Sequence, residues 1–233
     1  MVIPQSSEEA TDYALSLGYE SDCYQWYCPD ADGCSYLPKV LEMHIPTEDF
    51  RSSMGRDVLR HGNLLSPVPI LLIDSNDQYV RYVAEHILSE TEGYSDYLRA
   101  LAVVSFVQCA ISYSYDTVLY GAEDFCASPL ETLYLHSGDC EDTSVLLFSI
   151  LKAMGYQSVL LDYDGHVAVG LVMDGRILYC ETTLDFPCQP SPSLKWNRQE
   201  PRIWNCDSYP SVLAGINGGI AAYRNLINKV TGT

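Results

Sequence analysis

Apolar residues recur at helical spacing in three stretches of the chain. The first covers residues 78–88 and follows Asp77, a residue type that commonly caps a helix N-terminus. A second helix is predicted to start at Ser95 and to run through the nearly all-apolar segment 98–111, and a third covers 145–154. The residues of the first helix that we expect to face the core are Tyr79, Val80, Val83, Ile87 and Leu88.

A different pattern follows the third helix. Residues 159–163 read as a strand, and the next two apolar segments, 166–173 and 176–183, read as the arms of a β-hairpin. The arms are joined by Asp174-Gly175, a dipeptide favoured in two-residue type I′ turns. The sequence therefore predicts one helix followed by a small antiparallel sheet.

The short turn fixes the register of this hairpin. If Met173 faces Arg176, then His166 lies opposite Thr183, and Glu181 lies one diagonal step from His166 on the same face. Diagonal neighbours lie about 7–8 Å apart, which a long side chain can bridge. We therefore expect Glu181 to contact and orient the His166 ring.

The rest of the chain gives weaker signals. Region 1–73 reads as a loop-rich accessory region with one strand at 40–45, and a last helix is expected at 221–230. At 233 residues the chain is long enough for one well-buried domain, and nothing demands a second. The sequence thus predicts a single domain over 1–233, with its core in 95–186.

A cysteine lies at the start of the third predicted helix, in Gly138-Asp139-Cys140-Glu141-Asp142. Unpaired N–H groups and the helix dipole favour a thiolate there, which is one way a cysteine becomes a nucleophile. The three acidic neighbours oppose the thiolate, although they also suit helix caps. The sequence leaves open which influence is the stronger.

A cysteine at a helix start, a strand histidine and a strand carboxylate, in this order, resemble the transglutaminase-like branch of the papain-type cysteine enzymes. The likeness is to a prokaryotic subgroup and covers the middle of the chain. It is carried by Phe106-Val107-Gln108, Tyr115-Asp116, Pro129 with Glu131-Thr132-Leu133, Gly138 to Asp142, Gly165 to Gly170, and Glu181-Thr182-Thr183. The resemblance implies an α+β fold in which the nucleophile helix packs on a small antiparallel sheet.

The resemblance also implies roles for three residues. Cys140 would be the nucleophile, His166 the general base and acid, and Glu181 the third member, where the better-known enzymes usually have Asp. The reaction would be acyl transfer at an amide bond through a thioester. Water as acceptor makes a peptidase or amidase, and an amine makes a cross-linking transglutaminase; we expect hydrolysis, because water is the default acceptor.

An enzyme of this kind needs donors for the oxyanion. The backbone N–H of Cys140 is one candidate. The side chain of Gln108 is the second, because it interrupts the apolar segment 98–111 and a buried amide needs a partner. A structural glutamine with satisfied hydrogen bonds is the alternative interpretation.

Other functions are compatible with the same residues. A non-catalytic binding module on the same scaffold is the main alternative, and His136 is a second candidate for the base. The cluster Cys23, Cys28 and Cys34 lacks the tight Cys-x2-Cys spacing of zinc sites, so we predict no metal and no cofactor.

Composition limits the partners and the compartment. The formal net charge of −18 argues against a nucleic-acid partner and favours neutral or cationic peptide or protein substrates. No apolar run is long enough for a transmembrane segment, and residues 1–11 show no signal peptide.

The nine cysteines suggest an oxidising environment. Setting Cys140 aside as a free nucleophile leaves eight, an even number that suits disulfides and an extracellular or cell-surface location, with the cytoplasm as the alternative. We expect at least one disulfide within the cluster of Cys23, Cys28 and Cys34.

Overall fold

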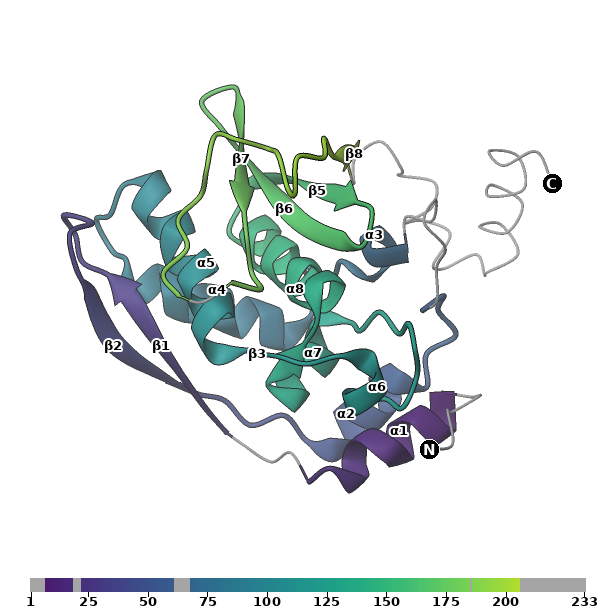
Figure 1. Ribbon diagram of the computed structural model, residues 1–233. Helices are drawn as coiled ribbons and strands as arrows, with labels where there is room; N and C mark the ends of the chain where they lie inside the picture. The colour runs from purple at the N-terminus through teal and green to yellow at the C-terminus, as the bar shows by residue number, and fades with distance from the viewer. Residues whose placement is uncertain (1–6, 19–21, 61–67, 185, 206–233) are drawn as a thin grey trace.

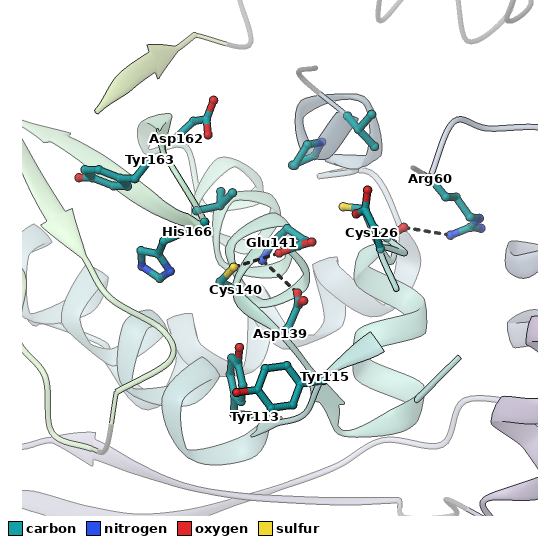
Figure 2. Close-up of a pocket in the computed structure, with 15 residues that line it drawn as sticks. Arg60, Tyr113, Tyr115, Cys126, Asp139, Cys140, Glu141, Asp162, Tyr163 and His166 are labelled. Atoms are coloured by element: carbon teal, nitrogen blue, oxygen red, sulfur yellow. Dashed lines mark hydrogen bonds between the residues drawn. The ribbon is translucent and has the colours of Figure 1, made fainter. Parts of the chain in front are cut away.

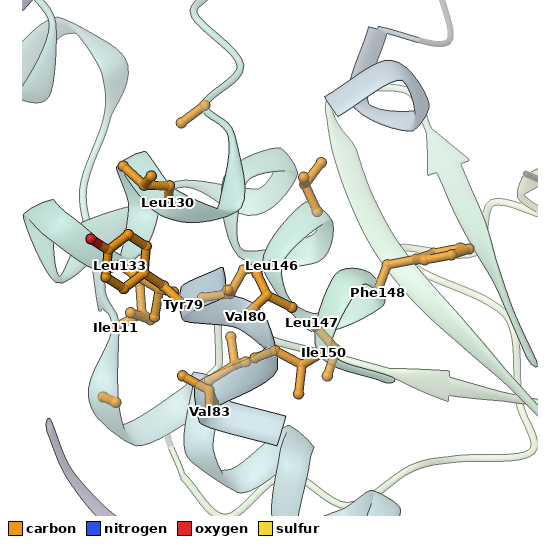
Figure 3. Packing of buried hydrophobic residues seen from close by; sticks show 14 of the residues in the cluster. Tyr79, Val80, Val83, Ile111, Leu130, Leu133, Leu146, Leu147, Phe148 and Ile150 are labelled. Carbon is orange, nitrogen blue, oxygen red and sulfur yellow. The ribbon is translucent and has the colours of Figure 1, made fainter. Parts of the chain in front are cut away.

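Helix α8 (Cys140–Ala153) is the central element of the computed structural model, which describes residues 7–18, 22–60, 68–184 and 186–205 (Figure 1). Residues Asp142 to Leu151 are all buried, because other elements surround the helix. The sheet packs on one side, and helices α4 (Gln78–Glu90), α5 (Asp96–Ala110) and α7 (Pro129–Leu135) pack on the others. Figure 3 shows side chains of α4, α7 and α8 meeting in this core.

The main sheet has four antiparallel strands in the order β7-β6-β5-β8. The strands are β5 (Gln157–Tyr163), β6 (His166–Met173), β7 (Arg176–Cys180) and β8 (Arg202–Trp204). Met173 pairs with Arg176, so the predicted register is confirmed. The second arm is shorter than predicted, because its ladder ends at Cys180. The expected α+β class, with the cysteine helix packed on a small antiparallel sheet, is confirmed.

The three predicted helices are present; the first two begin where predicted, and the third, α8, begins at Cys140, ahead of its apolar stretch 145–154. Asp77 caps α4 by accepting hydrogen bonds from two backbone N–H groups, and the Ser95 side chain caps α5. The prediction that Leu88 faces the core is wrong, because its side chain is 40% exposed. At about 100° per residue, Leu88 falls beyond the edge of the face that buries Val83 and Ile87.

The N-terminal region has more regular structure than predicted. Its elements are α1 (Ser7–Ser16), β1 (Cys23–Pro29), β2 (Tyr36–Glu42), α2 (Thr47–Met54) and α3 (Val68–Leu72). The predicted strand 40–45 is displaced, since β2 ends at Glu42. Tyr24, Trp26 and Cys28 alternate with exposed residues along β1 and belong to the same hydrophobic cluster as α8, so this region completes the main core. The helix expected at 221–230 lies outside the described residues.

The predicted disulfide within the N-terminal cysteine cluster is wrong. Among the residues that the structure describes, Cys28 and Cys34 are both free, and any bridge within the cluster would need one of them. Cys23 and Cys28 lie five residues apart on one strand, a separation of about 17 Å that no disulfide spans. Cys28 points into the core while Cys34 is exposed at the turn, so these two side chains do not meet. The N-terminal cluster therefore gives no support to the expected extracellular location.

Among the helices of the described residues, none is long and apolar enough to cross a membrane.

Candidate active site

The sequence around Cys140 builds a capped helix start. The Asp139 side chain accepts a hydrogen bond from the Glu141 backbone N–H at 3.2 Å, and the Asp142 side chain accepts one from the Asp139 N–H at 3.4 Å. The Asp139 side chain also accepts from the Asp142 backbone N–H, and this bond together with the one from the Asp139 N–H to the Asp142 side chain forms a capping box. Two of the acidic residues are therefore helix caps, as their positions suggested. Cys140 is the first residue of α8, and its backbone N–H therefore has no intrahelical partner.

Gly138 lets the segment before the helix pack closely. A Cβ at this position would lie 2.6 Å from the Asp142 Cβ and 3.3 Å from a Thr132 methyl group. The residue belongs to β4 (Ser137–Gly138), which pairs in parallel with β3 (Ser112–Tyr113) and places Tyr113 opposite Gly138. The glycine of the motif is therefore required by packing.

His166 is the first residue of β6, and only 6% of it is exposed. Its Nε2 lies 3.0 Å from Glu181 Oε2 and 3.3 Å from the Tyr179 hydroxyl. The Tyr179 hydroxyl in turn donates a hydrogen bond to the same Glu181 oxygen. The contact that register predicted between His166 and Glu181 is thus present.

Glu181 lies just beyond the β7 ladder, where the chain turns around its carboxylate. The second oxygen, Oε1, accepts from the Thr182 N–H at 2.9 Å, the Thr183 N–H at 3.0 Å and the Thr183 hydroxyl at 2.8 Å. Burial opposes the charge of Glu181, but hydrogen bonds from His166 and Tyr179 outweigh it and lower the pKa of the carboxyl group to about 2. The residue is therefore an anion over the whole neutral range.

Cys140 and His166 line one cleft of about 410 Å³ (Figure 2). Figure 2 shows the imidazole ring and the sulfur facing each other across it. The thiol donates a hydrogen bond to Glu141 Oε2 at 2.9 Å. Burial raises the pKa of the thiol and the charges of Glu141 and Asp139 raise it further, while the Val167 N–H lowers it. Burial and the neighbouring acids therefore favour the thiol over the thiolate at Cys140.

A group of carboxylates adjoins the cysteine. Possible ligand atoms of Asp116, Asp124 and Glu141 lie within 4.8 Å of one another, and so do those of Asp116, Asp139 and Asp142. Burial and these neighbours raise the pKa of Asp116 to about 7, and burial with Asp142 and Glu141 raises that of Asp139 to about 11. Asp116 Oδ1 is buried without a hydrogen-bond partner among the described residues. Oxygen donors of this kind could hold a hard cation such as Ca²⁺ or Mg²⁺.

Gln108 does not lie at the cleft. Its Nε2 donates to the Glu181 carbonyl at 2.7 Å and the Cys188 carbonyl at 3.0 Å, and its Oε1 accepts from the Cys188 N–H at 3.2 Å. Both amide donors are occupied, which favours the structural interpretation over the oxyanion role. His136, the other candidate base, stacks on Tyr24 with ring centroids 4.0 Å apart and does not line the cleft.

Sequence reasoning missed several residues of the site. Tyr179 and Trp196 contact His166, and Tyr113 and Tyr115 line the cleft as a T-shaped pair. Tyr115-Asp116 is part of the resemblance to the transglutaminase-like enzymes, but the sequence predicted no contact or role for these two residues. Apart from Tyr179, these residues lie far from the histidine in the chain, so no local pattern connects them to it.

Comparisons with known proteins add distant likenesses only. No protein family matches the chain, and no curated protein does. Two structures of LapG from Legionella pneumophila match at 14% identity with a TM-score of 0.43. The EGTA-treated form covers 68% of this chain and 98% of that one, and the other form 66% and 100%. A Cytophaga hutchinsonii protein proposed to be a cysteine protease matches at 14% identity and a TM-score of 0.39, covering 64% of this chain and 56% of that one. At these scores the likenesses carry no argument about activity.

Proposed function

We propose that this protein is a cysteine-dependent hydrolase of amide bonds in peptides or proteins. The observation that carries the proposal is the shared cleft of Cys140 and His166, with Glu181 on the far side of the imidazole. Nucleophile, base and a group that orients the base are the parts required for covalent catalysis by a cysteine. The transglutaminase-like resemblance of the sequence points to the same three residues.

The hydrogen bonds around His166 define how the proton would move. Nε2 faces the Glu181 carboxylate and the Tyr179 oxygen, both of which can accept, so Nε2 carries the proton in the neutral ring. Nδ1 is then unprotonated and can receive the proton of the Cys140 thiol. Glu181 stabilises the imidazolium ion that results.

The reaction would follow two acyl-transfer steps. The Cys140 sulfur attacks the amide carbonyl carbon as its proton passes to His166, and the backbone N–H of Cys140 donates to the oxyanion. The imidazolium then protonates the leaving amine, the C–N bond breaks and a thioester remains. Water, deprotonated by His166, attacks the thioester and releases the acid and the thiol.

The raised pKa of Cys140 is compatible with these reaction steps, because the thiol proton passes to His166 only as the sulfur attacks the carbonyl carbon. The resting thiol is protected by its hydrogen bond to Glu141. Acidic side chains of Asp124, Glu141 and Asp162 line the cleft and favour neutral or cationic substrates over acidic ones.

A peptide library, read both for newly released amines and for incorporation of a labelled amine, tests the proposal. We expect release in the wild type, none in Cys140→Ala, and full activity in the matched control Cys34→Ala, whose cysteine is exposed outside the cleft. Incorporation exceeding release would identify a transglutaminase instead. Equal binding of peptides by the wild type and Cys140→Ala, with turnover by neither, would identify a binding module and contradict the proposal.

A further inference from the structure

The Tyr179 hydroxyl joins the two partners of the base. It donates to Glu181 Oε2, and its oxygen lies 3.3 Å from His166 Nε2. A hydroxyl that gives its proton to the carboxylate can only accept from the imidazole. Tyr179 therefore favours the ring form with the proton on Nε2, the form that leaves Nδ1 free to act as a base.

Trp196 covers the face of the same ring. The indole and imidazole are nearly parallel, at 21°, with centroids 4.6 Å apart. An aromatic face at this distance excludes water from one side of the ring and is favourable for an imidazolium ion. Trp196 belongs to a segment without regular helix or long strand, so its position depends on how that segment is held.

The segment that carries Trp196 is anchored on both sides of it. Before it, Ser191 and Tyr179 exchange two backbone hydrogen bonds, of 2.7 and 2.9 Å. The Tyr163 hydroxyl donates to the Leu194 carbonyl at 2.6 Å. After it, Gln199 Oε1 accepts from the Asp164 N–H at 3.0 Å. Tyr179 thus contacts His166 through its side chain and holds the segment of Trp196 through its backbone.

We propose that Tyr179 and Trp196 are positioning residues that fix the orientation and the proton position of His166; the proposal rests on the function proposed above. Tyr179 acts at the edge of the ring and Trp196 at its face. Together they restrict rotation of the imidazole, so that Nδ1 stays directed at Cys140. Neither residue touches the reacting atoms.

The pH dependence of Cys140 alkylation by iodoacetamide tests this without a known substrate. Tyr179→Phe removes only the hydroxyl, and Trp196→Leu removes the aromatic face while Trp196→Phe keeps one. We expect about fivefold slower alkylation at neutral pH in Tyr179→Phe, the equivalent of one hydrogen bond, and a similar loss in Trp196→Leu that Trp196→Phe restores in part. The alkylation profile of both impaired variants should move to higher pH, because the imidazole is no longer held in the orientation and ring form that accept the proton of the sulfur.

The matched control is Tyr156→Phe, which removes a half-buried hydroxyl bound to the Asp96 carbonyl, away from the cleft. It should leave the alkylation profile unchanged. Wild-type profiles in Tyr179→Phe and Trp196→Leu, or slower rates with no change in profile, would overturn the positioning role and leave a purely structural one. His166→Ala separates the two levels: if it too leaves the profile unchanged, the proposed function fails, and if it alone changes the profile, only the positioning role fails.

Discussion

The two sides of the cleft are built differently. On the base side, Glu181 has a hydrogen-bond donor for each oxygen, and the imidazole has a partner at its edge and its face. On the nucleophile side, Asp116, Asp139 and Asp142 are buried close together, and one Asp116 oxygen has no hydrogen-bond partner among the described residues. The base side compensates the charge of Glu181 with hydrogen bonds, whereas burial and mutual repulsion raise the pKa values of the carboxyl groups on the nucleophile side and disfavour an anionic sulfur.

This difference implies that His166, and not the helix terminus, activates Cys140. The capping bonds of Asp139 and Asp142 explain why acids are present at the start of α8. Burial raises the pKa of the Cys140 thiol, and Glu141 and Asp139 raise it further. Without the imidazole, the sulfur would be less reactive than an ordinary cysteine.

Exchanging one carboxylate for an amide on each side should have opposite effects. Glu181→Gln should reduce turnover by about 100-fold or more, because an amide no longer stabilises the imidazolium and its NH₂ group can impose the wrong ring form. Glu141→Gln should instead increase the alkylation rate of Cys140, since it removes a negative charge and the acceptor of the thiol proton. If both variants lowered the reactivity of Cys140, or both raised it, the proposed difference between the two sides of the cleft would be contradicted.

Gly138→Ala tests the packing beneath the nucleophile. The added methyl group would meet the Asp142 Cβ at 2.6 Å, so the capping box must shift. We expect a loss of about 1–3 kcal/mol in the free energy of unfolding, as for other overpacked sites, with slower alkylation of Cys140. Gly175→Ala, in the hairpin turn with open space around it, is a control for loss of a glycine, although its φ of +72° adds local strain. Urea unfolding of both variants makes the measurement, and wild-type stability of Gly138→Ala would disprove the packing role.

The two sides should also respond oppositely to pH. The Glu181 pKa of about 2 lies below its ordinary 4.5, so its contribution to stability is present above pH 4.5 and is lost as the pH falls toward 2. The Asp116 pKa of about 7 lies above its ordinary 3.8, so the folded state binds the extra proton and loses stability as the pH rises from 3.8 to 7.

The free energy of unfolding of Asp116→Asn, measured by urea unfolding, should therefore exceed that of the wild type by roughly 1–2 kcal/mol at pH 8. The two proteins should differ little in this free energy at pH 4. Glu181→Gln should show the reverse order, with its deficit greatest near neutral pH. A stabilising effect of Asp116→Asn that is equal at both pH values would show that titration of this carboxyl is not responsible.

The smallest expected effect on stability is that of a divalent cation. Ca²⁺ or Mg²⁺ bound among the carboxylates would offset their repulsion, so either ion should raise the melting temperature of the wild type at pH 8 and raise that of Asp116→Asn less. Equal shifts in the two proteins would place the ion elsewhere.

The sequence predicted those parts of the molecule that depend on neighbouring residues. Asp77 and Ser95 as caps, and Asp174-Gly175 as a turn, each act within a few residues, and from the turn the hairpin register followed. The contact of His166 with Glu181 could be predicted because both residues belong to the same predicted hairpin.

Contacts between distant segments were not predicted. Trp196 reaches His166 only because the chain after Glu181 returns to the sheet, and the cluster around Asp116 forms where the start of α6 (Asp116–Leu119) and Asp124 come close to the start of α8. The disulfide prediction failed for a related reason, because an even number of cysteines does not indicate which of them lie close together in space. Cys23 and Cys28 lie on the same extended strand, β1, which holds them apart. The β1 strand was not predicted, because the region 1–73 was expected to be loop-rich with a single strand at 40–45.

The central claim is that His166 overcomes an environment that disfavours the Cys140 thiolate. Residue-resolved alkylation at pH 7, comparing Cys140 with the exposed Cys34 in the same molecule, measures this directly. The account predicts that Cys140 reacts faster than Cys34 in the wild type and slower than Cys34 in His166→Ala. Cys140 reacting more slowly than Cys34 in the wild type, or equally fast with and without His166, would contradict it.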